Sequence, residues 1–299
     1  MSDDISSQKV WLITGCSSGL GRELALTALA RGDKVIATVR NVVKIADLKQ
    51  RGALAVVLDA TFADDVVHKI VSDAIQVCGG HIDILVNNAA YSLVGSNEEC
   101  SGEEIADVFN ANVFGIYKML RVVLPFMRTQ RSGVIANIGS IGGRRGFPAS
   151  GVYCATKFAV AGLSESLREE VAHLGIEVTC VDLGWFRTEF INNFVRAKKT
   201  MADVGPAVEQ MRTEFETRNG KQSGDPVKAA KVLVDALTKS GRCMGRGNLP
   251  VRLAIGSETT QFVTDVLDSD KKDLLEWAEL VAGTDYDDDD KDTLAGGIP

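Results

Sequence analysis

The sequence contains few residues of the kinds that bind metal ions. It has three histidines, His68, His81 and His173, and six cysteines, none of which forms a C-x-x-C pair or lies at metal-ligand spacing from a histidine. This pattern argues against a zinc site, and no metal is expected. The cysteines are predicted to be reduced thiols, as in a cytosolic protein.

The sequence also lacks a long apolar run, a signal-peptide pattern and an excess of positive charge. No apolar run approaches the roughly 20 residues that a membrane-spanning helix needs, and residues 1–5 lack the basic and apolar regions of a signal peptide. We therefore expect a cytoplasmic protein with no membrane span. The formal net charge of −7 argues against nucleic acid as a partner, because binding phosphates requires a basic surface.

The sequence does contain enough apolar residues for a large core, at 45% of the chain. Apolar runs of strand length alternate with longer amphipathic stretches, which is typical of βαβ units around a parallel sheet. We predict an α/β fold with a doubly wound parallel sheet of about seven strands in one domain, residues 1–283. Strands are expected near 9–14, 33–39, 53–58, 82–87, 133–139, 176–182 and 251–255, and helices near 19–31, 42–51, 63–78, 102–129, 151–173, 226–239 and 258–281.

Residues 185–224 interrupt this alternation. They mix large apolar side chains with many charges, between a predicted strand and a helix that begins after Asp225-Pro226. We interpret the segment as a helical lid over a ligand, because insertions after strand ends commonly close over ligands. The alternative is a surface insertion whose aromatic side chains fill a small core of their own.

Residues 284–299 are acidic and are predicted to form a disordered tail. The run at 287–291 (DDDDK) matches an enterokinase recognition sequence. An added segment and a native acidic tail are both compatible with it, and no function is assigned to it.

Residues 113–127 are apolar on almost every side of the predicted helix. Such a helix is expected to pack against the sheet on one side and against another apolar surface on the other. A second copy of the chain is our hypothesis for that surface, as in a homodimer or homotetramer.

A glycine-rich segment, residues 14–21 (TGCSSGLG), lies between the first predicted strand and the first predicted helix. A doubly wound sheet binds a pyrophosphate at this position, where glycines allow a tight turn and a close approach of the backbone. The alternative is a glycine-rich turn that binds nothing. The residues expected to bind the cofactor in this loop are Gly15, Ser17, Ser18, Gly19, Leu20 and Gly21.

The end of the second predicted strand indicates which dinucleotide is bound. An Asp or Glu at this position would hold the ribose of NAD, whereas here the strand ends with Thr38 and Arg40. Arg40 can form a charge-assisted bond to a 2′-phosphate, so NADP(H) is favoured, unless Arg40 only faces solvent. Asp59 is expected to bond the adenine amino group, and Asn87 and Ala89 to pass beside the adenosine ribose.

Tyr153 and Lys157 are four residues apart at the start of a predicted helix, so they share one face. Ser140 follows an apolar strand and lies at the carboxyl end of the sheet. A phenol can protonate a developing alkoxide if its pKa falls from about 10 to about 7, which takes about 4 kcal/mol. A nearby ammonium and an oxidised nicotinamide could together supply this energy. By itself, however, such a Tyr–Lys pair is common on solvated helix surfaces.

The order Asn112, Ser140, Tyr153, Lys157 after a glycine loop resembles the classical short-chain dehydrogenase/reductase family, with its Rossmann-type fold, over about residues 8–282. Segment 153–160 (YCATKFAV), Arg40 and segment 252–257 (RLAIGS) are similar to the NADP-linked 17β-hydroxysteroid dehydrogenase branch. The resemblance implies that Tyr153 is the acid/base and that Ser140 orients the carbonyl oxygen. It also implies that Lys157 holds the nicotinamide ribose and lowers the pKa of Tyr153, and that Asn112 keeps a relay water. Tyr153 and Lys157 would then also contact the cofactor.

Two positions depart from the family pattern, which usually has Pro-Gly after the sixth strand and Gly at position 90. Here Leu183 precedes Gly184, and Ala90 replaces the glycine. The resemblance still places Gly184, Phe186 and Thr188 at the cofactor, with Thr188 at the carboxamide. Between Ser140 and Tyr153, Arg144 and Arg145 are expected to face water rather than to bind an acidic group of the substrate.

The first functional hypothesis is an NADPH-dependent ketone reductase, or the reverse alcohol dehydrogenase, for a hydrophobic small molecule such as a steroid, terpenoid or polyketide. The second is a biosynthetic enzyme that epimerises, dehydrates or cyclises its substrate while NADP(H) stays bound, suggested only by Trp185. The third is a non-catalytic NADP(H)-binding protein, which the intact tetrad disfavours.

Overall fold

The computed structural model describes residues 8–284 and contains a seven-stranded parallel sheet. The strand order is β3-β2-β1-β4-β6-β7-β9. The strands are β1 Val10–Ile13, β2 Lys34–Val39, β3 Leu54–Val57, β4 Ile84–Asn87, β6 Gly133–Ile138, β7 Ile176–Leu183 and β9 Arg252–Ile255. All seven predicted strands are confirmed to within a few residues, as is the doubly wound order.

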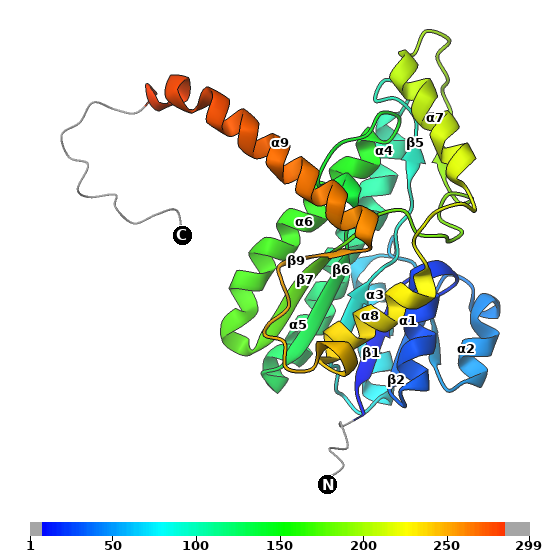
Figure 1. The fold of residues 1–299 in the computed structure, drawn as a ribbon. Coiled ribbons are helices and arrows are strands. Elements are labelled where there is room, and N and C mark those ends of the chain that lie inside the picture. Colours follow the sequence, from blue (N-terminus) through cyan, green and yellow to red (C-terminus); the bar gives the residue numbers. More distant parts are fainter. Residues whose placement is uncertain (1–7, 285–299) are drawn as a thin grey trace.

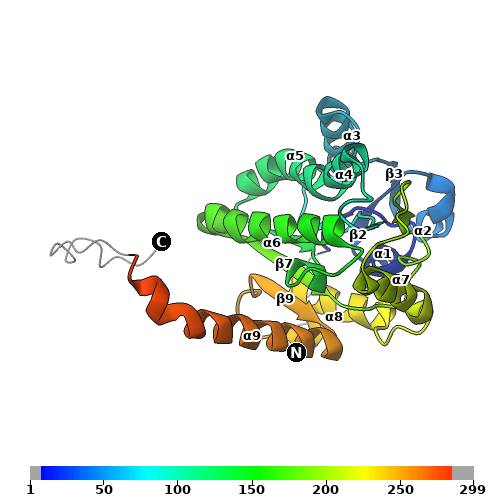
Figure 2. The ribbon, with the colours of Figure 1, turned by 90° about the horizontal axis from the view of Figure 1, so that it is seen from above.

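Helices cover both faces of this sheet, which explains why its strands are apolar on both sides (Figure 2). Along β1, Trp11 and Ile13 pack in one core cluster with α1 Gly19–Ala30 and α8 Pro226–Thr238. Leu12 points to the other face, which packs on α3 Asp64–Val77, α5 Gly115–Gln130 and α6 Gly151–Val171. The order of the strands reverses between β1 and β4, and a crevice is expected at their carboxyl ends.

The helix predicted over 102–129 is interrupted. It forms α4 Gly102–Phe109, a π-helical turn Asn110–Phe114, and α5. The Asn112 side chain accepts a hydrogen bond from Tyr91 N and donates to Tyr91 O, at 3.1 and 2.8 Å. These bonds link the π-helical turn to the segment after β4. Tyr91, which makes both of them, is distant from Asn112 in sequence.

Of the other predicted helices, the one expected over 42–51 differs from the structure, whereas the last, expected near 258–281, is confirmed. The segment predicted as 42–51 is a 3₁₀ turn, Val42–Ile45, followed by the short helix α2 Ala46–Gln50. The last helix, α9 Ser257–Ala282, packs on the body only near its start, where Thr259, Val263 and Val266 are buried. Figure 1 shows its second half extending away from the sheet.

The lid, residues 185–224, contains the helix α7 Pro206–Arg218 and the short strand β8 Val195–Arg196. β8 pairs in parallel with β5 Leu93–Val94, and this two-stranded sheet was not predicted. The lid is therefore joined to the segment after β4, above the carboxyl ends of the main strands. Apart from Thr284, the predicted acidic tail lies outside the described residues.

Candidate active site

A cavity of about 1090 Å³ opens at the carboxyl ends of the strands and beneath the lid. This volume exceeds that of a typical small-molecule pocket and is large enough for a dinucleotide and a substrate together. The predicted site residues that line it are Gly15, Ser17, Ser18, Gly19, Leu20, Thr38, Arg40, Asp59, Ala89, Ser140, Tyr153, Lys157, Gly184, Phe186 and Thr188. Gly21, Asn87 and Asn112 do not line it.

The glycine loop has the conformation that its sequence predicts. Gly15 and Gly19 have positive φ angles of 74° and 58°. A Cβ at Gly21 would lie 2.4 Å from Asn88 Nδ2 and 2.6 Å from Gly15 O, so glycine is needed there for close packing. Ser18 is the N-cap of α1, and within the described chain its side chain makes no capping bond. The first N–H groups of α1 thus remain available to an anion.

The strand β4 ends at Asn87, and the asparagine that follows it, Asn88, has a different role. Asn88 lines the cavity, and its Nδ2 donates to Thr14 O at 2.9 Å and to Gly15 O at 3.2 Å, which ties the glycine loop to β4. Asn87, which was expected beside the ribose, is instead buried in the sheet and donates to Asn137 Oδ1 at 2.8 Å. The sequence alone does not distinguish the two because they are adjacent at the strand end.

The part of the cavity at the end of β2 carries two cations. Arg40 is exposed at the end of β2, and Lys44, which was not identified from the sequence, lines the same part of the cavity. Lys44 could have been found as a second basic residue in the turn after β2. Thr38 O accepts from Gly15 N and Cys16 N, so its backbone also holds the glycine loop. Asp59 Oδ1 is bonded to Thr61 N and Oγ1, at 2.9 and 2.8 Å.

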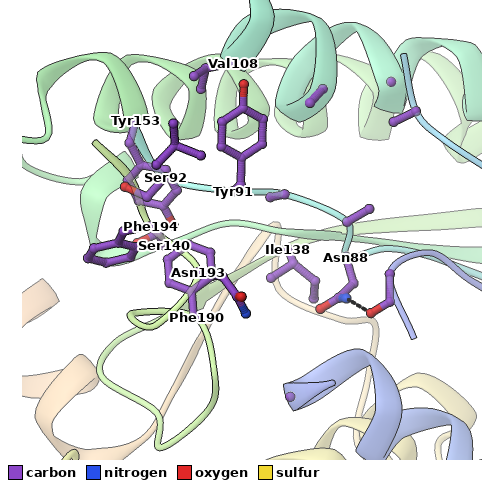
Figure 3. A pocket seen from close by; sticks show the side chains of 18 of the residues that line it. Asn88, Tyr91, Ser92, Val108, Ile138, Ser140, Tyr153, Phe190, Asn193 and Phe194 are labelled. Atoms are coloured by element: carbon purple, nitrogen blue, oxygen red, sulfur yellow. Dashed lines mark hydrogen bonds between the residues drawn. The ribbon is translucent and has the colours of Figure 1, made fainter. Parts of the chain in front are cut away.

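Ser140, Tyr153 and Lys157 meet at the other end of the cavity. Ser140 follows β6, while Tyr153 and Lys157 lie in the first turns of α6. The Nζ of Lys157 donates to Ile138 O at 2.7 Å and lies 5.7 Å from the centroid of the Tyr153 ring. Figure 3 shows the side chains of Tyr153 and Ser140 near those of Phe190 and Phe194. The predicted convergence of these three residues is therefore present.

Burial changes the pKa values of both groups on α6. It raises the pKa of Tyr153 above its ordinary value, and a hydrogen bond with Ser140 offsets this only in part. Burial also lowers the pKa of Lys157 to about 8, against an opposing effect from Cys180 and Asp182. The expected fall in the Tyr153 pKa is thus not produced by the protein groups alone, because desolvation outweighs the hydrogen bond with Ser140.

Asn112 is completely buried beneath the site. In addition to its two bonds with Tyr91, its Nδ2 donates to Thr156 Oγ1 at 3.2 Å, and that hydroxyl donates to Tyr153 O at 2.7 Å. Both amide atoms thus bond to protein groups. The side chain therefore holds Tyr91 and the start of α6, and the role of Asn112 in keeping a relay water stays a prediction.

The aromatic side chains of the lid serve two purposes. Phe190 lines the cavity, and its ring centroid is 5.8 Å from that of Tyr153. Phe194 connects it to Phe215, which is 7% exposed and packs in a small cluster with Val94 and Ala149. Some rings of this segment therefore fill a small core, and Phe190 lies at the cavity beside Tyr153, while closure of the segment over a ligand stays a prediction.

The structure also bears on two predictions for segments next to the site, one for Arg144 and Arg145 and one for Leu183. Arg144 does not face water, because its Nε donates to the buried Asp182 at 2.9 Å, whereas Arg145 is exposed as expected. Leu183, in place of the usual proline, pairs with Ile255 and ends β7. The glycine that follows it, Gly184, is required by packing, since a Cβ there would lie 2.4 Å from Thr259 Oγ1.

Residues 8–284 contain no helix long and apolar enough to cross a membrane. Over the same range, histidine, cysteine and carboxylate side chains form no group that could hold a metal ion.

Comparison with known proteins gives a consistent picture. A family model described as short chain dehydrogenase matches residues 9–199. The oxidoreductase BOA17 of Botryotinia fuckeliana is 32% identical over 91% of this chain and 97% of its own length. Human 17-beta-hydroxysteroid dehydrogenase type 1 is 34% identical over 66% of this chain and 62% of its own. A short-chain dehydrogenase structure from Streptomyces avermitilis has a TM-score of 0.82 and 37% identity, covering 94% of this chain and 100% of that one. Other structures of similar fold contain NAD, NADP or NADH.

Proposed function

Because the chain belongs to the short-chain dehydrogenase family, whose members are oxidoreductases that bind a nicotinamide cofactor, we propose that it reduces a ketone with NADPH, or oxidises the corresponding secondary alcohol. The observation that carries this proposal is the convergence of Ser140, Tyr153 and Lys157 on the cavity beside the glycine loop. Fold alone would not justify it, because one fold supports many reactions.

Ser140, Tyr153 and Lys157 have complementary roles in the proposed reaction. The bound cofactor supplies the hydride and, when oxidised, a positive charge. The Ser140 hydroxyl orients the carbonyl oxygen, and the Tyr153 phenol donates a proton to it as the alkoxide forms. The raised pKa of Tyr153 keeps the phenol protonated before reaction. The Lys157 ammonium then stabilises the phenolate that remains, since the two groups share a buried site.

The residues around the glycine loop fit a dinucleotide with a 2′-phosphate. The loop allows close approach of backbone N–H groups, and the uncapped start of α1 suits the pyrophosphate. Arg40 and Lys44 place two cations at the end of β2, where no carboxylate opposes an added phosphate. These features favour NADP(H) over NAD(H), with Ser17 and Thr38 as further contacts.

The substrate end of the cavity favours an apolar molecule. It is lined by aromatic and aliphatic side chains of the lid and of the segment after β4, among them Tyr91, Leu93, Phe190 and Phe194. Burial of a polycyclic or long-chain body against these groups is favourable by the hydrophobic effect. A steroid, terpenoid or polyketide ketone is therefore the proposed substrate class, in line with the similarity to a hydroxysteroid dehydrogenase.

The two alternative functions have less support. Trp185, the only hint of a pocket rebuilt for epimerisation, dehydration or cyclisation, lines the cavity and also lies beside Phe215, with ring centroids 6.0 Å apart, but it adds no further reacting group. A non-catalytic NADP(H)-binding role does not account for the convergence of Ser140, Tyr153 and Lys157.

We also propose that the chain forms a homodimer or homotetramer in the cytoplasm. Phe114, Tyr117 and Phe158 are 52%, 41% and 48% exposed, on the π turn and on the adjacent helices α5 and α6. A hollow of about 200 Å³ lies between α5 and α6 on the same side. Large exposed apolar side chains gathered in this way are typical of an interface.

A panel of ketones and steroids, assayed with NADPH by its absorbance, tests the function. Oxidation of NADPH that depends on an apolar ketone supports the proposal. Binding of NADPH without turnover of any carbonyl or alcohol would favour one of the alternatives.

A further inference from the structure

A buried charged cluster lies next to the loop that carries Ser140. Its centre is Asp182 in β7, whose side chain is 0% exposed. Arg144 Nε donates to Oδ2 of Asp182 at 2.9 Å. Arg252, from β9, donates through Nε to Oδ2 at 3.1 Å and through Nη2 to Oδ1 at 2.8 Å. The two arginine side chains are only 17% and 11% exposed.

This cluster holds the loop on both sides of Ser140. A Cβ on Gly139 would lie 2.9 Å from Asp182 Oδ1, so the backbone before Ser140 rests on the carboxylate. After Ser140, Arg252 Nη2 donates to Gly143 O at 3.0 Å, and Arg144 ends the 3₁₀ turn Ile141–Gly143. Both ends of the loop therefore contact side chains of the neighbouring strands β7 and β9.

The loop also packs directly on the helix that carries the other reacting groups. A Cβ on Gly143 would lie 2.7 Å from Lys157 O. Within the loop, Ser140 Oγ accepts a hydrogen bond from Gly142 N at 3.0 Å, which sets the direction of the hydroxyl. A shift of the loop would thus change the position of the Ser140 hydroxyl relative to Tyr153 and Lys157.

We propose that Asp182, Arg144 and Arg252 form a clamp that positions the Ser140 hydroxyl for the reaction. This inference rests on the proposed function. The three are positioning residues, since they act through the loop, and only the loop contacts the cavity. A buried ion pair is weak evidence for stability, because desolvation of the charges offsets their attraction. A fully bonded polar network does, however, hold a site rigidly, and a small misplacement of a catalytic group is costly to rate.

Arg144 is the member best suited to a test. In Arg144→Met the carboxylate of Asp182 keeps two hydrogen bonds, because Arg252 still donates to both of its oxygens. Folding should therefore be retained. Arg145→Met is the matched control, because Arg145 is the next residue and is exposed.

For Arg144→Met we expect kcat for a ketone identified in the panel to fall about tenfold, with the KM for NADPH unchanged, because only the reacting geometry is disturbed. Arg145→Met should stay within about twofold of the unmodified protein. Arg144→Lys should recover part of the rate, since an ammonium can reach the carboxylate but forms a less directional bond. Equal kcat values for the Met variants at 144 and 145 would overturn the proposal.

Hydrogen–deuterium exchange of the cofactor-free protein gives a readout independent of turnover. Amides of residues 139–147 should exchange faster in Arg144→Met and at an unchanged rate in Arg145→Met. Faster exchange with unchanged kcat would show a merely structural role and would overturn the positioning role. If the unmodified protein reduces no carbonyl, the proposed function fails. In that case unchanged amide exchange over 139–147 in Arg144→Met would contradict the clamp as well. Faster amide exchange over these residues would support the clamp.

Discussion

At the scale of single residues, we expect the choice of cofactor to depend on the charge at position 40. Arg40 is exposed at the end of β2 and lines the cavity with Lys44. In Arg40→Asp a charge-assisted bond to the 2′-phosphate is replaced by repulsion, so the preference for NADPH over NADH should fall about 100-fold. The ratio of the kcat/KM values for NADPH and NADH measures this preference. Lys49→Asp, with the same change of charge on the exposed surface of α2, is the control; an unchanged ratio in Arg40→Asp would show that the guanidinium does not contact the phosphate.

A second prediction at this scale concerns pH. Burial lowers the pKa of Lys157 to about 8, so the ammonium is present below this pH and is lost above it. If the ammonium is needed, kcat/KM for ketone reduction should fall as pH rises through about 8. Tyr153 does not limit this range, because its own pKa is raised and the phenol stays protonated.

Measurement of kcat/KM against pH tests this assignment, because that quantity reports the ionisation of the free enzyme. In Lys157→Arg the cation persists to higher pH. The fall in kcat/KM at alkaline pH should therefore move to a higher pH, even though the rate of this variant is lower. A flat profile up to about pH 10, or a fall that stays in place in Lys157→Arg, would contradict the role given to the ammonium.

At the scale of elements, the lid is attached to the body by a buried ion pair. Glu99, which is 1% exposed, bonds Arg212 of α7 and accepts from Ser96 N and Met201 N, at 2.7 and 3.0 Å. The bond from Arg212 is the main reason that the pKa of Glu99 is lowered to about 2. A lowered carboxyl pKa contributes stability above the ordinary value of 4.5, and this contribution is lost as pH falls toward 2.

We therefore expect Glu99→Gln to loosen the lid. Removing one charge of a buried pair costs roughly 3 kcal/mol, so amide exchange over 198–215 should become faster and the KM of an apolar ketone should rise. Glu209→Gln is the matched control, since Glu209 bonds the same arginine but is 58% exposed. Equal exchange and KM in the two variants would mean that the buried pair does not hold the lid.

At the scale of the whole molecule, the dimer proposal has a direct test. Light scattering at micromolar concentration should give a mass at least twice that of the chain. Phe158→Asp places a charge among the exposed apolar groups of α5 and α6 and should shift the mass to that of a monomer. Val77→Asp, at a site that is 73% exposed on α3, should leave it unchanged. A monomeric mass for the unmodified protein contradicts the proposal.

The sequence predicted the sheet well because buried parallel strands are short apolar runs between helical stretches. It also predicted the meeting of Ser140, Tyr153 and Lys157, since one follows a strand end and the other two are one helical turn apart. Contacts between distant residues could not be predicted in this way. Arg144 and Arg145 are identical in type, and only the fold brings Asp182 to one of them.

The other differences between the predicted and the observed elements also come from contacts between residues that are distant in sequence. The break in the helix at Asn112 depends on hydrogen bonds to Tyr91, and the pairing of β5 with β8 joins two segments that are only two residues long each. Neither has a periodic pattern of its own. Local sequence therefore predicted the elements and the reacting groups, whereas the contacts that hold them in position come from tertiary packing.

The most direct test of the account is the Tyr153→Phe variant, which removes one hydroxyl and keeps the ring packed against Phe190. We predict that kcat for ketone reduction falls by a factor of about 100 or more, while the affinity for NADPH stays within about threefold, because only the proton donor is lost. Single-turnover oxidation of NADPH, with cofactor affinity measured by titration on the same sample, separates the two quantities. A Tyr153→Phe protein that binds NADPH and reduces the ketone at the unmodified rate would contradict the central claim.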